Sequence, residues 1–220
     1  MESMILSMLR GGASHVPTVV FVEGNIGSGK TEVMAAMKDW LKLNKKQVIM
    51  FTEETEVWEH EHLLQDHYAR PNERAAKRAF EALGPLRQYI ERAHFIEKCG
   101  SEYDYIIMEK HPTTTLEVFG ADKAVRALFE TVHASRPFMD LPKTTVYVKA
   151  SPATCLERII KRDREAERSF DSVFIKGLSD KYGTMMLDRR EAGHVVIAVD
   201  SNRMAAAEVA DEACKQLLAL

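Results

Sequence analysis

The chain has 220 residues, of which 45% are hydrophobic and 29% are charged, and its formal net charge is -3. These values are typical of one soluble globular domain with a sizeable core, and they exclude a strongly basic nucleic-acid-binding protein. No apolar run reaches the length of a membrane span, so we expect small-molecule ligands and neither nucleic acid nor a membrane as a partner. The cysteines, at 99, 155 and 214, lack metal-ligand spacing and indicate reduced thiols, as in a cytoplasm (the host cell's, if the protein is viral).

Residues 1–17 are expected to form a loose N-terminal arm, and residues 18–220 a single domain. An apolar stretch over 18–22 predicts a buried strand, and 31–43 predicts a helix. The run between them fits G-x-x-x-x-G-K-[ST], the phosphate-binding loop: Gly24, Asn25, Ile26, Gly27, Ser28, Gly29, Lys30 and Thr31. Its glycines let backbone N–H groups surround phosphate oxygens. We expect Lys30 to reach the β- and γ-phosphates of a nucleotide and the Thr31 hydroxyl to hold Mg²⁺.

An acidic cluster follows the second predicted strand, residues 47–52. Glu53 comes first after the strand and is the best placed to orient an acceptor hydroxyl and accept its proton. A solvated acidic loop is the alternative interpretation, and the cluster alone favours it. Trp58 shifts the balance, since an indole near a loop end packs against a planar base, although it is equally typical of a core residue.

A long helix is predicted over residues 72–98, with Gly84 and Pro85 in its middle. Proline removes a backbone hydrogen bond there, so we expect a kink that aims side chains into a pocket.

The third predicted strand, residues 105–108, leads into Glu109-Lys110-His111-Pro112. We expect Glu109 to contact Mg²⁺ or its water shell, and Lys110 to hold the Glu53 carboxylate or the acceptor oxygen. A surface ion pair, worth little energy, is the alternative for Lys110. His111 is interpreted as a structural residue.

Four cations stand within residues 161–168: Lys161, Arg162, Arg164 and Arg168. By composition alone, a solvated helix face and a mobile lid that closes over a transferring phosphate fit this segment equally well. The phosphate-binding loop favours the lid, which we place at about 161–170.

Further predicted strands at 144–149 and 195–199 alternate with predicted helices at 121–135, 152–164, 170–190 and 204–218. This alternation predicts an α/β fold of the P-loop kinase type, with three layers: a five-stranded parallel sheet flanked by helices on both faces, and an arginine-rich lid. Ligands bind beyond the carboxyl ends of such strands, where the loop, Glu53 and Glu109 all stand.

From about residue 19 to 182 the chain resembles the deoxyribonucleoside kinases, including the herpesvirus thymidine kinases and the insect multisubstrate enzyme. The loop with the preceding Glu23 is similar to that of the cellular members, and Glu53 with Trp58 resembles their E-P-x-x-x-W. The segment from His62 to Tyr68, the E-K-H-P after the third strand and the basic segment with its following helix resemble further family motifs in the same order, the last two leaning towards the viral branch.

The resemblance implies roles for these residues. Glu53 would be the catalytic base and Trp58 would line the nucleoside pocket. Tyr68 and Glu167 would face the sugar 3′-hydroxyl, and Phe119 would lie against the base. Arg162 and Arg164 would clamp the phosphate.

Three departures from the family pattern stand out. Glu54 replaces the proline after the catalytic glutamate, and Lys110 replaces an arginine, which removes bidentate geometry. The family reads the base with a glutamine on the kinked helix, and the alignment puts Arg87 there with Gln88 beside it. Neighbouring helix positions point about 100° apart, so only one of the two can face the pocket centre.

The prediction from sequence is a kinase that transfers the γ-phosphoryl group of ATP to the 5′-hydroxyl of a deoxynucleoside, with thymidine or other pyrimidine deoxynucleosides expected first. Mg²⁺ and a homodimer through helices beside the pocket are implied by the resemblance. A nucleoside monophosphate kinase of the thymidylate kinase type, and a non-catalytic nucleotide-binding module, stay open as alternatives.

Overall fold

The computed structural model describes residues 16–69, 73–135, 141 and 143–220. The predicted N-terminal arm therefore lies almost wholly outside the described residues. Within the described ranges, no helix is long and apolar enough to cross a membrane.

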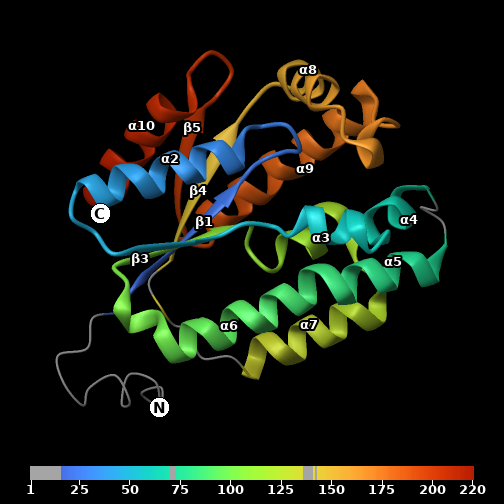
Figure 1. Cartoon of the computed structure of the whole chain (residues 1–220), viewed down its shortest axis with the longest axis horizontal. Helices are drawn as coiled ribbons and strands as arrows, with labels where there is room; N and C mark the ends of the chain where they lie inside the picture. Colours follow the sequence, from blue (N-terminus) through green and yellow to red (C-terminus); the bar gives the residue numbers. More distant parts are fainter. Residues whose placement is uncertain (1–15, 70–72, 136–140, 142) are drawn as a thin grey trace.

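A five-stranded parallel sheet forms the centre of the molecule (Figure 1). The strand order is β2-β3-β1-β4-β5, which confirms the predicted fold class. The strands are β1 (Thr18–Glu23), β2 (Val48–Phe51), β3 (Tyr105–Glu109), β4 (Lys143–Lys149) and β5 (Val195–Asp200). The order reverses around β1, so the loop after β1 opens at the switch point, where ligands bind in such sheets.

The sheet is covered on both faces because β1 is apolar on both sides. Val20 and Val22 pack with α2 (Lys30–Leu43) and α10 (Ala206–Leu218) on one face. Val19 and Phe21 pack with α6 (Arg87–Cys99) and α7 (Lys123–Ser135) on the other. The helix α9 (Ser172–Glu191) packs on the second face against β4 and β5 through its own cluster around Tyr182.

The predicted long helix is broken into three parts. The first is α5 (Arg74–Glu81), the second is a π-helical turn, η1 (Ala82–Leu86), and the third is α6. Pro85 lies inside the turn, and its missing N–H removes one bond of the helical ladder, so the chain widens there and does not merely bend. The turn changes which later side chains face the carboxyl ends of the strands.

Short elements that the sequence pattern does not reveal complete the fold. They are α3 (Thr55–His60), α4 (Leu63–Ala69), η2 (Gly100–Glu102) and the π-helical η3 (Thr115–Gly120). In the predicted lid, α8 (Pro152–Arg162) ends at Asp163, which has a left-handed φ of 50°, and η5 (Glu165–Glu167) precedes α9.

Candidate active site

The loop between β1 and α2 has the backbone conformation of a phosphate cradle. Gly24 and Gly27 have φ values of 153° and 77°, a range that residues with a side chain rarely adopt. A Cβ on Gly27 would lie 2.4 Å from the carbonyl oxygen of Cys155, and one on Gly24 would lie 2.5 Å from that of Val148. The glycines are therefore required by close packing against the following elements as well as by φ.

Two helices hold this loop from behind. The Asn25 side-chain amide donates to the Ile175 carbonyl (2.9 Å) and to Ser179 Oγ (2.7 Å), both on α9. Arg158 of α8 donates to the Ser28 carbonyl (3.0 Å).

Lys30 Nζ donates to the Asn25 carbonyl at 3.0 Å, and burial together with the neighbouring Lys110 lowers the pKa of Lys30.

A cavity of about 490 Å³ opens in front of the loop. Ile26, Gly27, Gly29, Lys30 and Thr31 line its phosphate end. Its other walls include the strand-end residues, the lid and a set of aromatic side chains: Glu53, Glu109, Lys110, Arg162, Arg164, Glu167, Trp58, Tyr68, Phe80 and Phe119. One cavity thus brings together the phosphate loop, an acidic centre and an aromatic end.

An ion pair forms the acidic centre. Lys110 Nζ lies 2.9 Å from both carboxylate oxygens of Glu53, and Glu109 Oε2 accepts the Glu53 backbone N–H at 3.1 Å. Burial opposes the charge on Glu53, but Lys110, Lys30 and Arg92 outweigh it and lower the pKa of Glu53. Burial likewise opposes the charge on Lys110, yet Glu53 and Glu109 raise its pKa, so the pair is ionised.

A half-buried arginine supports this centre from α6. Arg92 donates to the Thr52 carbonyl and to Gln88 Oε1, the latter at 3.0 Å. It therefore fixes the end of β2, from which Glu53 projects. Its charge also acts on Glu53 and Glu109.

The lid arginines converge on one acid. Glu167, which is 5% exposed, lies 2.5 Å from Arg162 Nη2 and 3.0 Å from Arg164 Nη1. Arg164 also pairs with Glu59 of α3 at 3.1 Å. In this conformation the guanidinium groups are held by carboxylates at the cavity wall. Burial, together with the charges of Glu53 and Glu167, raises the pKa of Tyr68, and the two arginines oppose that rise.

Aromatic rings build the opposite end of the cavity. Trp58 meets Phe80 edge to face at 5.3 Å, and His67 stacks on Phe80 at 4.5 Å. Lys110 Nζ lies 5.0 Å from the centre of the Phe119 ring, so this ring lies close to the acidic centre. Trp58 and Phe80 are only 3% and 8% exposed, so they border the cavity as members of a buried cluster with Leu64, and planar groups pack well against aromatic rings.

The family model for deoxynucleoside kinases matches residues 20–218. The chain belongs to the deoxynucleoside kinase family. The resemblance found in the motifs is thereby confirmed.

Individual relatives are distant. The chain is 24% identical over 193 residues to a deoxyguanosine kinase of Dictyostelium discoideum, covering 84% of this chain and 64% of that protein. It is 26% identical over 176 residues to a putative kinase, protein 143R, of Invertebrate iridescent virus 6, covering 77% and 82%. The chain therefore spans just under two thirds of the length of the first relative.

A solved structure supports the fold. A deoxyadenosine kinase from M. mycoides, whose structure holds the products dCMP and a flexible dCDP, superimposes with a TM-score of 0.64 and 14% identity, over 92% of this chain and 100% of that one.

Most of the residues predicted for this family site line the cavity, and a few do not. Gly24, Asn25 and Ser28 shape the phosphate loop from behind. Arg87 and Gln88 lie outside the lining: Arg87 pairs with Glu54 at 3.0 Å, and Gln88 is buried against Arg92. Gln88 borders a small hollow that it shares with Glu53 and Lys110.

Several residues of the site escape sequence reasoning, among them Phe80, Glu81 and Arg92. Glu81 lines the aromatic end, and Arg92 supports Glu53. Glu81 carries one usable signal, since it is an acid next to Phe80 at the end of a helix that precedes a Gly-Pro pair. Arg92 carries none, because charged residues are ordinary on amphipathic helices.

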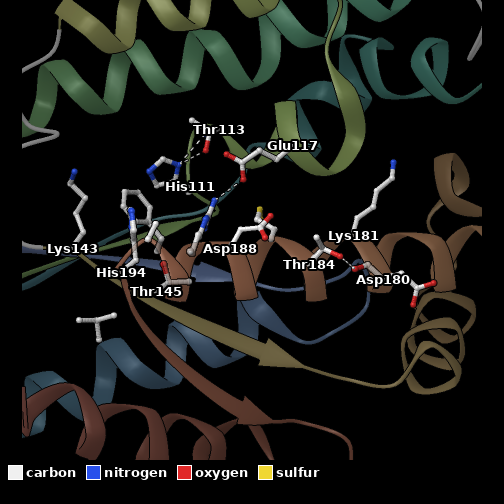
Figure 2. Close-up of a pocket in the computed structure, with 15 residues that line it drawn as sticks. His111, Thr113, Glu117, Lys143, Thr145, Asp180, Lys181, Thr184, Asp188 and His194 are labelled. Atoms are coloured by element: carbon white, nitrogen blue, oxygen red, sulfur yellow. Dashed lines mark hydrogen bonds and ion pairs between the residues drawn. The ribbon is translucent and has the colours of Figure 1, made fainter.

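A second, larger hollow of about 700 Å³ lies between α9 and the loop after β3, over Phe21 of β1 and Thr145 of β4 (Figure 2). His111 lines it, with Nδ1 2.8 Å from Thr113 Oγ1, and Arg189 reaches Glu117 at 3.4 Å. No described residue of the phosphate loop lines this hollow. His111 thus borders this hollow, and it also borders a small hollow shared with Glu53 and Lys110.

Proposed function

We propose that this deoxynucleoside kinase family member transfers the γ-phosphoryl group of ATP to the 5′-hydroxyl of a deoxynucleoside. The observation that supports it best is the Glu53–Lys110 pair, at 2.9 Å, inside the cavity that Lys30 and the aromatic rings share. An acceptor hydroxyl between the phosphate loop and the rings would have an ionised carboxylate within its reach.

The proposed reaction uses each wall of the cavity. The loop amides and Lys30 hold the donor phosphates, and the rings hold the base. Glu53 orients the 5′-hydroxyl and accepts its proton as the new O–P bond forms and the bond to the leaving ADP breaks. Lys110 stabilises the charge near the acceptor oxygen. Arg162 and Arg164 leave Glu167 to neutralise the transferring group, and Glu167 is then available, with Tyr68, to the sugar 3′-hydroxyl.

Mg²⁺ fits the residues present. The Thr31 hydroxyl and the Glu109 carboxylate both line the cavity beside Lys30. No three acidic, His or Cys residues of the described chain form a metal cluster of their own. This pattern suits an ion that takes one or two carboxylates and completes its shell with water and substrate phosphates. Bound there, Mg²⁺ would neutralise charge on the donor phosphates.

Base preference, oligomeric state and cellular location also belong to the proposal. Two of the three similar proteins named above are called a deoxyguanosine kinase and a deoxyadenosine kinase, so the expected preference for thymidine or other pyrimidines gains no support from their names. A homodimer is retained from the family resemblance, and light scattering would test it. A cytoplasmic location is retained from the cysteines, all of which are free thiols.

The substitution Glu53→Gln tests the proposal directly. It keeps the size of the side chain and removes the base, so we expect kcat to fall by roughly 10²–10⁴ with ATP affinity nearly unchanged. Activity is measured with ATP and a panel of the four deoxynucleosides plus dTMP. Glu61→Gln, an exposed acid of the same segment, is the matched control and should behave as wild type. Near-normal turnover in Glu53→Gln would refute the assigned role, and consumption of dTMP alone would favour a nucleoside monophosphate kinase.

A further inference from the structure

A buried carboxylate closes the aromatic end of the cavity. Glu81 is the last residue of α5, lines the cavity beside Phe80 and is only 2% exposed. Acidic side chains are almost never so deeply buried without a specific partner. A carboxylate at this depth therefore calls for hydrogen-bond donors around it.

The contacts of Glu81 within the protein use only part of its capacity. Oε2 accepts the Asp122 backbone N–H at 2.8 Å, and Oε1 lies 3.8 Å from Lys77 Nζ. Among the described residues these are the contacts of the carboxylate, whereas two carboxylate oxygens offer about four acceptor positions. Acceptor capacity therefore remains at the wall of a cavity in which the rings are suited to a base.

Lys77 and the Asp122 N–H also favour the charged form of the carboxylate. Burial, with the Asp122 charge, raises the pKa of Glu81, and the Asp122 N–H and Lys77 reduce that rise without cancelling it. A ligand that donates hydrogen bonds to the carboxylate adds to the same effect, because hydrogen bonds to an ionised acid stabilise it.

An ionised carboxylate only accepts hydrogen bonds, and this separates the four bases. Guanine presents two adjacent donors on its pairing edge, N1–H and the 2-amino group. Adenine and cytosine each present one amino donor beside a ring nitrogen that is an acceptor, and thymine presents one N–H between two carbonyl oxygens. Each of these three would place a lone pair against the carboxylate, and guanine alone would not.

We propose that Glu81 reads the base and makes guanine the preferred base of this site. The inference rests on the proposed deoxynucleoside kinase activity and names its substrate class. Guanine N1–H and N2–H donate to the two carboxylate oxygens, between the rings of Trp58 and Phe119, while the sugar extends towards Glu53. No covalent step is involved, so the role is recognition alone.

The test compares kcat/KM for deoxyguanosine, deoxyinosine, deoxyadenosine, deoxycytidine and thymidine at fixed ATP. In the wild-type enzyme we expect deoxyguanosine to lead. Deoxyinosine, which lacks only the 2-amino group, should fall by about tenfold because one hydrogen bond to the carboxylate is lost. This comparison needs no variant, so it does not depend on folding of a mutant.

Glu81→Gln replaces two acceptors by one acceptor and one donor. We expect kcat/KM for deoxyguanosine to fall by roughly 10- to 100-fold while that for deoxyadenosine or deoxycytidine is kept or rises. Glu91→Gln makes the same change on α6, where Glu91 is 58% exposed and outside the cavity, and should leave the order of substrates unchanged.

The outcomes separate the two proposals. A wild-type enzyme that phosphorylates no nucleoside overturns the proposed function. A wild-type enzyme that phosphorylates pyrimidine deoxynucleosides or deoxyadenosine in preference to deoxyguanosine overturns the guanine inference alone. Equal rates with deoxyguanosine and deoxyinosine, or an unchanged substrate order in a folded Glu81→Gln enzyme, would do the same.

Discussion

The two ends of the active-site cavity are built by different means. At the phosphate end the backbone makes the site, with glycine φ values of 77° and 153° and carbonyl groups packed where a Cβ would stand. At the base end side chains make it, from α3, α4, α5 and η3. A backbone site tolerates almost no substitution but is visible as a motif. A side-chain site changes with each residue, and it can alter specificity without disturbing phosphate binding.

The strongest way to test this contrast is Gly27→Ala. The methyl group would meet the Cys155 carbonyl at 2.4 Å, and alanine is strained at a φ of 77°. We expect a loss of about 2–4 kcal/mol in unfolding free energy, combining left-handed strain with overpacking, and ATP affinity reduced by more than tenfold. Urea unfolding and calorimetric titration with ATP measure the two. A Gly27→Ala variant that binds ATP as the wild type does would show that the cradle is not set by the backbone.

A smaller effect is expected at the base end, where His67 stacks on Phe80. Burial, and secondarily Lys77, lower the pKa of His67 from 6.5 to about 4. The folded protein thus binds this proton less readily than the unfolded chain does. The contribution of neutral His67 to the free energy of unfolding is therefore fully present above pH 6.5, and it is lost as the pH falls from 6.5 towards 4.

The variant His67→Gln should remove this part of the acid sensitivity. Allowing for partial solvent screening, we expect the wild type to lose on the order of 2 kcal/mol more than the variant over that pH range. Thermal unfolding of both proteins at several pH values measures it. His94→Gln, at a histidine whose side chain is 56% exposed, is the control and should follow the wild type. Parallel pH curves for wild type and His67→Gln would contradict the buried neutral state.

The smallest expected effect is that of Gly177→Ala, which serves as a comparison for Gly27→Ala. Gly177 lies inside α9, and a Cβ there would meet no atom within 4 Å. Gly177→Ala should therefore stabilise the protein by about 0.5–1 kcal/mol, since alanine is the better helix former. The same urea experiment applies. If Gly177→Ala destabilised the protein as Gly27→Ala is expected to, the cost at Gly27 could not be assigned to its close packing.

The contrast also explains how far sequence reasoning reached. The sheet and the phosphate loop were predictable, because continuous apolar runs and glycines at fixed spacing follow from burial and backbone geometry. The neighbourhood of Glu53, Glu109 and Lys110 followed from parallel strands ending at one edge. The predicted pairing of Glu53 with Lys110 agrees with the structure.

The side chains at the base end of the cavity were harder to predict from the sequence. The pattern over residues 72–98 predicts one kinked helix, and the choice between Arg87 and Gln88 depends on the rotation of that helix. The π-helical turn at Pro85 changes the rotation, so that Arg87 pairs with Glu54 and Gln88 with Arg92, while Glu81 lines the cavity. Hydrophobic periodicity carries no information about such an insertion.

The hydrogen bonds that join the phosphate loop to α8 and α9 restrict where the predicted lid can move. Arg158 and Asn25 join the loop to the last helix before the lid and the first helix after it. Both ends of the predicted lid are therefore anchored to the phosphate-binding loop, where the proposed mechanism would hold the triphosphate. In the proposed mechanism Arg164 would move with the short connection that begins at Asp163, whereas Arg162, at the end of α8, would move by rotation of its side chain. In the proposed mechanism, closure would therefore need only local rotation of a few side chains and peptide units.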